Sequence, residues 1–373
     1  MRLIVTGGGT GGHIYPAIEV AKEMLRILPQ SKVLFVGTRE GMESSLAPRE
    51  GLPFEAVRSA GVMGKSPVAA ARGLYRAATG LGDARTVLKS FRPDVVLGTG
   101  GYASGPVVMS AYMLGIPRAV QEQNAIPGKT NLFLSRLCGR VFAAWEYSRQ
   151  FFPKKDRVVV TGNPVRRELL LPKGEAGRAY YGIPQGVPVV LVLGGSRGAR
   201  TLTEAATAMA KAGLDGARMI LIAGKEYYRT AAMALEAVPE DGIDGARAGN
   251  IIIRQYEHNM AMAYGAADLV VARAGGMTLS EVTALGLPSV IVPSPNVANN
   301  HQEHNARALS EAGAALVIKE EGDVAEVVAR EALGLLRDES RRSRMRAASL
   351  RLGKPTAGES IARELVRMAQ KGR

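Results

Sequence analysis

The chain has 373 residues, 46% of them hydrophobic, which is too apolar for a disordered chain and, at roughly 100–200 residues per domain, suggests two domains. Lys and Arg number 48 against 34 Asp and Glu, and the resulting net charge of +14 favours an anionic partner such as a nucleic acid, an anionic membrane or a phosphorylated substrate. The single cysteine, Cys138, excludes an internal disulfide framework and a multi-cysteine zinc site.

Two segments share one order of predicted elements. A short apolar strand at 3–6 leads into a glycine loop at 7–12 and a helix at 17–28. The same order recurs at 189–193, 194–198 and 202–212. A buried strand, a glycine turn and a helix open a doubly wound α/β domain. Two such openings, about half a chain apart, predict two Rossmann-like domains in tandem.

Further short apolar runs alternate with helical segments along both halves of the chain. This alternation predicts parallel sheets with helices on both faces. Gly and Pro concentrate between 161 and 184, and we expect domains at 1–162 and 163–340, followed by a helical, basic segment at 341–373 that packs back towards the first domain. The additional strands are expected at 32–36, 95–98, 119–121, 141–143, 219–223, 251–254, 269–272, 289–292 and 315–317.

The segment 64–92 carries six basic residues and one acid, Asp83. As a helix it places Leu74, Ala78 and Leu81 on a face opposite two arginines. A basic amphipathic helix can lie on an anionic bilayer, but it can equally be a surface helix whose apolar face is in the core. The candidate membrane patch comprises Arg72, Leu74, Tyr75, Arg76 and Leu81. No run approaches the ~18 apolar residues of a membrane span, and the N-terminus lacks a signal-peptide pattern, so we expect a cytosolic protein.

The first glycine loop leaves room for a phosphate or sugar to approach the backbone. A dinucleotide site requires an acid at the end of the second strand, and Glu40 is not well placed for this role. An NAD-type oxidoreductase is therefore a weaker alternative, which stays open. His13, at the end of this loop, could take a proton from an attacking hydroxyl, or could hydrogen-bond a neighbouring loop.

Three later segments could hold a nucleotide sugar. The loop 194–200 offers glycines, the hydroxyl of Ser196 and two arginines, which suits a diphosphate, although the arginines could simply be solvated. Glu281, in the segment 273–281, could grip ribose hydroxyls, or could form a capping box with Thr278. The segment 299–306 gathers amides and imidazoles that suit a sugar. The spacing of its two histidines could bind metal, but no carboxylate or cysteine pattern supports this.

Seven motifs follow one another along nearly the whole chain: GGTGGH (8–13), GGYASGP (100–106), EQN (122–124), TGNPVR (161–166), GGSRGAR (194–200), RAGGMTLSE (273–281) and HQEHNA (301–306). In this order they closely resemble the MurG family. The resemblance implies a GT-B glycosyltransferase, with two Rossmann-like domains facing across a cleft. It also implies inverting transfer of N-acetylglucosamine from UDP-N-acetylglucosamine to the 4-hydroxyl of lipid I, giving lipid II for peptidoglycan synthesis.

The resemblance also implies residue roles. His13 is the candidate general base, and Gly100, Gly101, Tyr102 and Ser104 are expected to receive the acceptor diphosphate. Gln121 departs from a histidine found in many relatives, and His301 departs from a second glutamine. The residues expected to contact the donor are Thr10, Gly11, Gly12, Asn124, Arg166, Ser196, Arg273, Gly276, Met277, Thr278, Leu279, Ser280, Glu281 and Gln302.

The expected partners follow from the same resemblance. They are UDP-N-acetylglucosamine, lipid I, an anionic membrane surface at the cytoplasmic face of the bacterial plasma membrane, and other cell-wall synthesis proteins, with no cofactor and no obligatory metal. Aromatic residues make up only 5% of the chain and no recognition motif appears, which argues against nucleic acid. The alternatives are another GT-B enzyme, with a different lipid acceptor or acting as a UDP-sugar epimerase, and the oxidoreductase.

Overall fold

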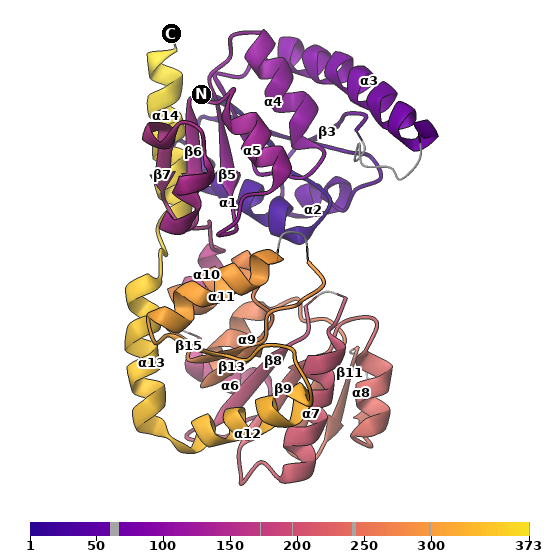
Figure 1. Cartoon of the computed structure of the whole chain (residues 1–373), viewed down its shortest axis with the longest axis vertical. Coiled ribbons are helices and arrows are strands. Elements are labelled where there is room, and N and C mark those ends of the chain that lie inside the picture. Colours follow the sequence, from indigo (N-terminus) through magenta and orange to yellow (C-terminus); the bar gives the residue numbers. More distant parts are fainter. Residues whose placement is uncertain (60–66, 172, 196, 241–243, 298–299, 373) are drawn as a thin grey trace. The chain divides into compact units, whose positions relative to one another are not determined.

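The computed structural model divides into two compact α/β units (Figure 1). The first comprises Met1–Arg166 and Lys354–Arg373, and the second Arg167–Gly353. The structure describes residues 1–59, 67–171, 173–195, 197–240, 244–297 and 300–372, with 67–78 described by their backbone alone.

The first unit is built on a seven-stranded parallel sheet with the order β3-β2-β1-β4-β5-β6-β7. Central β1 pairs with β2 and β4, so that Leu3 lies beside both Val33 and Val95. The predicted parallel sheet is confirmed. The two strands absent from the prediction, β3 and β7, are three-residue strands at the two edges of the sheet. The strands are β1 (Arg2–Thr6), β2 (Lys32–Gly37), β3 (Phe54–Ala56), β4 (Val95–Gly98), β5 (Arg118–Glu122), β6 (Arg140–Ala143) and β7 (Val158–Val160).

Helices cover both faces of this sheet. Alternate residues of β1 face opposite sides, as the two-residue period of a strand requires. Leu3 and Val5 pack against α1 and α14, whereas Ile4 packs in a second core with residues of α3, α4 and α5. The helices are α1 (Gly11–Ile27), α2 (Glu43–Arg49), α3 (Pro67–Phe91), α4 (Ser104–Met113), α5 (Lys129–Ser135) and α14 (Ala357–Lys371), with short 3-10 turns η1 (Glu146–Phe151) and η2 (Lys155–Arg157).

The second unit has an eight-stranded sheet with the order β10-β11-β12-β9-β8-β13-β14-β15. The six strands from β12 to β15 in this order pair parallel as predicted, but β11 pairs antiparallel with both β10 and β12, which corrects the expectation of a wholly parallel sheet. Only Gly249 and Asn250 separate β11 from β12, and a two-residue link permits a hairpin but no parallel crossover. The strands are β8 (Val189–Leu193), β9 (Arg218–Ile222), β10 (Val238–Pro239), β11 (Gly245–Ala248), β12 (Ile251–Arg254), β13 (Leu269–Ala272), β14 (Ser289–Ile291) and β15 (Ala315–Val317).

The main core of the second unit lies between its sheet and the helices α7 and α12. Apolar residues of α7 such as Leu202 and Met209 meet Val328 and Leu335 of α12 over the buried strands. The helical elements are η3 (Arg167–Leu170), α6 (Gly174–Tyr180), α7 (Arg200–Ala212), α8 (Tyr228–Ala234), α9 (Met260–Ala266), α10 (Gly276–Ala284), α11 (His301–Glu311), α12 (Val324–Arg337) and α13 (Glu339–Leu352).

The expected C-terminal segment 341–373 is divided between the two units. Helix α13 packs against α10 and α12 in the second unit. Helix α14 packs against α1, and Ile361 and Leu365 are fully buried in the first core. The first unit also continues to Arg166, beyond the boundary expected at 162.

The basic segment forms a long helix, α3, in spite of its glycines. Gly80 has a packing reason, because a Cβ there would lie 2.0 Å from the carbonyl oxygen of Arg58. Leu81 is half-buried, and its carbonyl accepts a hydrogen bond from Ser110. Within the described part of the chain, no helix is both long and apolar enough to cross a membrane. The side chains of Arg72, Leu74, Tyr75 and Arg76 lie outside the described residues.

Candidate active site

Two predicted loops of the first unit meet at the carboxyl ends of β1 and β4. The amide of Gly8 donates to the carbonyl of Gly100 across 3.3 Å. Gly101 has a φ of +75°, and a Cβ there would lie 2.0 Å from the carbonyl oxygen of Gly8. The contact therefore requires glycine at 101, for its conformation and for its lack of a side chain.

Buried hydroxyls fasten these loops to the strands. Thr99 Oγ1 lies 3.1 Å from the carbonyl oxygen of Thr6 and 2.7 Å from that of His13, so its one hydrogen can be donated to either. Ser104 Oγ lies 3.0 Å from the carbonyl of Thr6 and 2.8 Å from that of Gly100. Ser104 is fully buried, and its hydroxyl positions the loop; its contact with an acceptor diphosphate stays a prediction. Tyr102, on the same loop, is 37% exposed.

His13 lies in the first turn of α1, which begins at Gly11 rather than at residue 17 as expected. The early start places Thr10 at the N-cap and Gly11 and Gly12 in the first turn. His13 Nδ1 lies 3.2 Å from the carbonyl of Gly8. With its proton on Nδ1, the ring donates to that carbonyl and carries its lone pair on Nε2, the tautomer that a base requires.

The sequence interpretation missed Glu43, a fully buried acid on α2. Its Oε1 accepts hydrogen bonds from the amide (3.0 Å) and hydroxyl (2.7 Å) of Thr38, and its Oε2 lies 3.4 Å from the amide of Gly9. A buried carboxylate that accepts several hydrogen bonds stabilises the loops that supply them. The sequence interpretation considered Glu40 as the acid after the second strand. Nothing in the local sequence distinguishes an acid that the fold buries, such as Glu43, from a solvated one.

Asn124 is held by a second buried acid, Glu122. The Glu122 carboxylate accepts from the amide of Asn124 at 2.9 Å, from the amide of Gly128 at 3.1 Å and from Nδ2 of Asn131 at 2.9 Å. Asn131 and His13 both border Gly100, since a Cβ on Gly100 would be 3.2 Å from Nδ2 of Asn131 and 3.2 Å from Nε2 of His13. Asn131 is therefore a site residue that the motif series did not include.

Gln121, which departs from the family's histidine, lies in a buried ladder of amides. Its Nε2 donates to Asn163 Oδ1 at 2.7 Å, and Gln123 Nε2 donates to the carbonyl of Thr99 at 2.7 Å. Gln121 is fully buried. These buried amides connect the end of β5 to the loop after β4, so Gln121 supports that loop from the protein interior.

In the second unit, the loop after β8 lines a pocket of about 530 Å³. The lining includes Gly194, residues 197–201 at the start of α7, Arg273 and Gln302. The structure thus brings together the glycine loop and two residues that were expected to contact the donor. Ser196 lies outside the described residues.

This second loop is packed against the loop that follows β9. Gly198 and Gly224 both have positive φ, and a Cβ on Gly224 would lie 2.2 Å from the amide nitrogen of Gly198. Arg197 pairs with Glu226 at 2.9 Å, and its side chain is 85% exposed. Helix α7 therefore begins at the pocket, and its first-turn amides favour an anion there.

Arg273 lines the pocket and is held there by an ion pair. Its Nη1 lies 2.5 Å from Glu320 Oε2, and Glu320 also accepts from the hydroxyl of Thr201. Burial raises the pKa of Glu320, but the hydrogen bonds from Arg273 and Thr201 outweigh it, and the net pKa is below the usual value of 4.5. Gln302 Oε1 accepts from the amide of Ser294 at 2.9 Å.

The capping-box interpretation of Glu281 is wrong. Helix α10 begins at Gly276 with Gly275 as its N-cap, so Thr278 is inside the helix. Glu281 instead accepts a hydrogen bond from the Tyr264 hydroxyl at 2.8 Å.

The other expected donor residues on α10 differ in exposure. Leu279 is fully buried, so its side chain packs in the core, and its contact with the donor stays a prediction. Met277, Thr278 and Ser280 are half-buried, and Gly276 is buried.

Arg166 belongs to the first unit, where its guanidinium lies 5.5 Å from the ring centre of Tyr15. His301 and His304 are half-buried at the start of α11. Outside the undescribed gaps, no group of three or more His, Cys, Asp or Glu residues is arranged to hold a metal.

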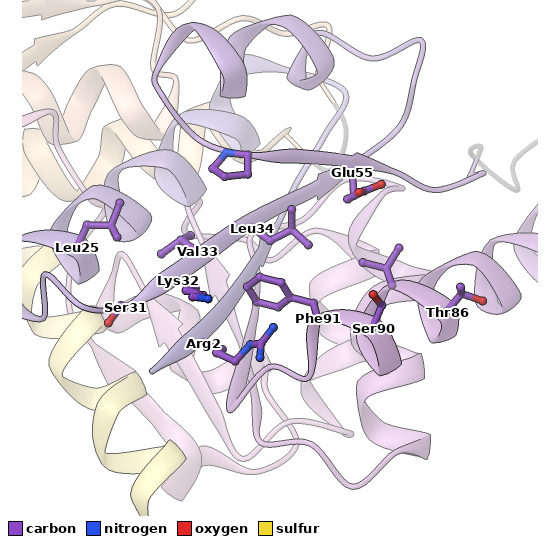
Figure 2. Close-up of a pocket in the computed structure, with 12 residues that line it drawn as sticks. Arg2, Leu25, Ser31, Lys32, Val33, Leu34, Glu55, Thr86, Ser90 and Phe91 are labelled. Carbon is purple, nitrogen blue, oxygen red and sulfur yellow. The ribbon is translucent and has the colours of Figure 1, made fainter.

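A cavity of about 660 Å³ lies at the opposite edge of the first sheet (Figure 2). Arg2 and Lys32, at the starts of β1 and β2, line it together with Leu34 and Phe91. None of the residues expected from the motifs is in its lining. Open α/β sheets bind ligands at the carboxyl ends of their strands, so the chemistry is assigned to the loops above and not to this cavity.

Comparison with known proteins matches both halves of the chain. Residues 3–143 match the glycosyltransferase family 28 N-terminal domain, and residues 189–361 match the family 28 C-terminal domain. A curated UDP-N-acetylglucosamine–N-acetylmuramyl-(pentapeptide) pyrophosphoryl-undecaprenol N-acetylglucosamine transferase from Desulforudis audaxviator (strain MP104C) is 43% identical over 375 residues, covering 100% of both chains. A transferase of the same name from Thermoanaerobacter sp. (strain X514) is 42% identical, covering 97% of this chain and 98% of its own.

Solved structures agree with this assignment. The crystal structure of Acinetobacter baumannii MurG aligns with a TM-score of 0.75 and 26% identity, covering 98% of this chain and 99% of that one. A UDP-N-acetylglucosamine 2-epimerase from Neisseria meningitidis aligns with a TM-score of 0.69 over 98% of this chain, but at 16% identity it shows the shared fold alone. The chain therefore belongs to the MurG family of glycosyltransferases.

Proposed function

We propose that the protein transfers N-acetylglucosamine from UDP-N-acetylglucosamine to the 4-hydroxyl of lipid I, giving lipid II for peptidoglycan synthesis. The observation that carries this proposal is the 43% identity, over the full length of both chains, with a transferase named for that donor and acceptor. The two units supply the two kinds of site that such a reaction needs: a basic group beside a glycine loop, and a pocket suited to a diphosphate.

The donor is assigned to the pocket of the second unit. Its diphosphate would lie on the loop 194–199 at the start of α7, where backbone amides and Arg200 offset the charge that develops on departing UDP. Gln302 would bind the sugar. Glu281 would hold the ribose hydroxyls, with its carboxylate oriented by Tyr264.

His13 is assigned as the general base. The acceptor's 4-hydroxyl would attack C1 of the donor sugar, its proton would pass to Nε2 of His13, and the bond from C1 to the UDP oxygen would break with inversion. The hydrogen bond from Nδ1 to Gly8 keeps the ring in the tautomer that can accept this proton.

The first unit would lie on the membrane that holds the lipid acceptor. Three large apolar side chains are exposed near α3: Tyr112 (50%) and Met113 (59%) at the end of α4, and Phe133 (49%) on the adjoining α5. Arg118 and Arg136 lie near them in the chain and can meet anionic headgroups. The protein would thus bind peripherally, at the cytoplasmic face.

The direct test is transfer of labelled sugar from UDP-N-acetylglucosamine to a lipid I analogue, with UDP-glucose as the control donor. We expect a labelled lipid product with the first donor and at least a tenfold lower rate with the second. Equal use of both donors would contradict the assigned sugar specificity.

A UDP-sugar epimerase is the second candidate, because an epimerase shares the fold. It would convert UDP-N-acetylglucosamine without any acceptor. Incubating the protein with donor alone and separating the sugar nucleotides distinguishes the two activities, since a transferase does not change the configuration at C2 of the sugar.

A further inference from the structure

A second polar pocket of the first unit takes no part in the proposed reaction. It has a volume of about 580 Å³ and lies where β5 and β6 begin, beside the C-terminal half of α14. Helix α14 packs on one face of the sheet, where Figure 1 shows it beside β6, and Glu364 of α14 pairs with Arg140 of β6. The charged residues that line the pocket are Arg118, Arg140, Arg157, Glu364, Arg367 and Lys371.

The pocket holds five cationic side chains and one acid. Glu364 is already shared, with 3.1 Å contacts to both Arg140 and Arg367. Burial raises the pKa of Glu364, but the hydrogen bonds from Arg140 and Arg367 outweigh this effect, and the net pKa is below its ordinary value. Arg118, Arg157 and Lys371 form no ion pair with any residue that the structure describes.

The two uncompensated arginines are held in place by main-chain carbonyls. Arg118 donates from Nε to Leu137 at 2.6 Å and from Nη1 to Ile116 at 2.7 Å. Arg157 donates from Nη1 to the carbonyl of Cys138 at 2.9 Å. These bonds fix each guanidinium and leave further N–H groups for a ligand. A preorganised guanidinium loses less entropy on binding than a free surface arginine.

Arg118 and Arg157 also repel one another. Burial lowers the pKa of Arg118, and the positive charge of Arg157 lowers it further. Both cations act on the buried Cys138 thiol, whose pKa burial nonetheless raises to about 12. That thiol therefore stays protonated and supplies no counter-charge. Half-buried cations without an acid partner reduce stability unless an anion compensates them.

We propose that this pocket binds a phosphate-bearing anion. Arginine guanidinium groups match phosphate oxygens in paired hydrogen bonds, and the excess of cations over acids in the pocket favours an anionic ligand. The phosphate could belong to the headgroup of an anionic lipid, because Arg118 also stacks on the exposed ring of Tyr112 at 4.7 Å. It could equally be free phosphate or diphosphate.

The first experimental arm titrates inorganic diphosphate into the full-length protein with the donor pocket saturated by UDP. Calorimetry and thermal unfolding report the binding. We expect one diphosphate to bind and the Tm to rise. Arg157→Gln and Lys371→Gln should each weaken this binding at least tenfold. Arg363→Gln, on the exposed face of the same helix, removes an equal charge outside the pocket and should leave binding unchanged.

The second arm measures co-sedimentation with vesicles of phosphatidylglycerol and of phosphatidylcholine. Loss of phosphatidylglycerol binding in Lys371→Gln but not in Arg363→Gln would identify a lipid phosphate as the ligand. Equal behaviour of all three variants in both arms, or no binding in either, would overturn the proposal. Lys371 is exposed and makes no hydrogen bond or ion pair with the part of the chain that the structure describes, so its substitution should not impair folding or sugar transfer, and the result stands apart from the transferase assignment.

Discussion

The two glycine loops that open the two units have the same chain order but are fastened in different ways. The loop after β1 is fixed by buried groups: Glu43, Thr99 and Ser104 are all fully buried and bond to it or to the strand before it. The loop after β8 borders an open pocket. Its side-chain contact within the described residues is the ion pair of Arg197 with Glu226, and both side chains are exposed.

This difference suits the two tasks assigned to the loops. A base must meet its substrate in one geometry, so His13 benefits from a loop whose position is fixed before binding. A loop that holds a flexible diphosphate can adjust to its ligand. The following experiments test this contrast, from the largest expected effect to the smallest.

Replacing the base should have the largest effect. His13→Ala should lower kcat by roughly 10²–10⁴-fold, because proton transfer in the transition state contributes about that much. Donor affinity, measured by calorimetry, should change less than about threefold, since the donor is assigned to the other unit. His13→Gln can keep a hydrogen bond to Gly8 but cannot act as the base. Restored turnover in that variant would show that His13 only positions the loop.

Two glycine substitutions compare the packing of the loops directly. Gly101→Ala and Gly195→Ala share the strain of a positive φ, at +75° and +81°, which costs roughly 1–2 kcal/mol. A Cβ at 101 also overlaps the Gly8 carbonyl, whereas one at 195 meets no atom within 4 Å. Overpacking adds about 1–3 kcal/mol, so urea unfolding should show the larger loss for Gly101→Ala. Equal losses would contradict the contrast.

Removing the charge of Glu281 should weaken donor binding rather than the stability of the fold. Glu281→Gln keeps an acceptor for the Tyr264 hydroxyl but loses the carboxylate. We expect the Kd for UDP-N-acetylglucosamine to rise by roughly 10–100-fold, as for loss of a charged hydrogen bond. The control, Tyr264→Phe, should raise the Kd less. A lowered Tm with unchanged affinity would restore a purely structural role for Glu281.

The ion pair in the donor pocket predicts a pH dependence. The pKa of Glu320 is lower in the folded protein than its ordinary value of 4.5, so the fold favours its charged form. That stabilisation is fully present above pH 4.5 and is lost as the pH falls through the lower, folded pKa. The stability difference between wild type and Glu320→Gln, followed by thermal unfolding, should therefore shrink below pH 4.5. A constant difference down to pH 3 would exclude this cause.

The smallest effect is expected at Arg197. An exposed pair contributes about 0–1 kcal/mol, and salt screens it. Arg197→Gln should therefore change the free energy of unfolding by less than about 1 kcal/mol, and the difference should fall further in 0.5 M NaCl. A larger, salt-independent loss would mean that the second loop is as firmly held as the first.

The sequence predicted the parallel strands and both glycine loops because hydrophobic runs and glycines are local signals. It missed the start of α1, where the contacts of Ile14 in the core override the poor helix propensity of Gly11 and Gly12. It also missed the antiparallel edge of the second sheet, whose short strands carry little apolar pattern.

Roles that depend on distant partners could not be predicted. Glu43 and Asn131 look like ordinary polar residues until the fold buries them against the first loops. Glu281 had the spacing of a capping box, but its hydroxyl partner is Tyr264, on another helix. Spacing along the chain thus identified the loops, whereas the side chains that hold them depend on tertiary contacts.

The position of α14 has a consequence for synthesis on the ribosome. Ile361, Ala362, Leu365 and Ala369 complete a core whose other members lie mostly in the first half of the chain. The nascent first unit therefore has to wait, with one face of its sheet uncovered, until the whole second unit has been translated. During that interval its apolar surface is open to chaperones and to aggregation, and a message cut short before residue 357 would yield a protein that cannot close its first core.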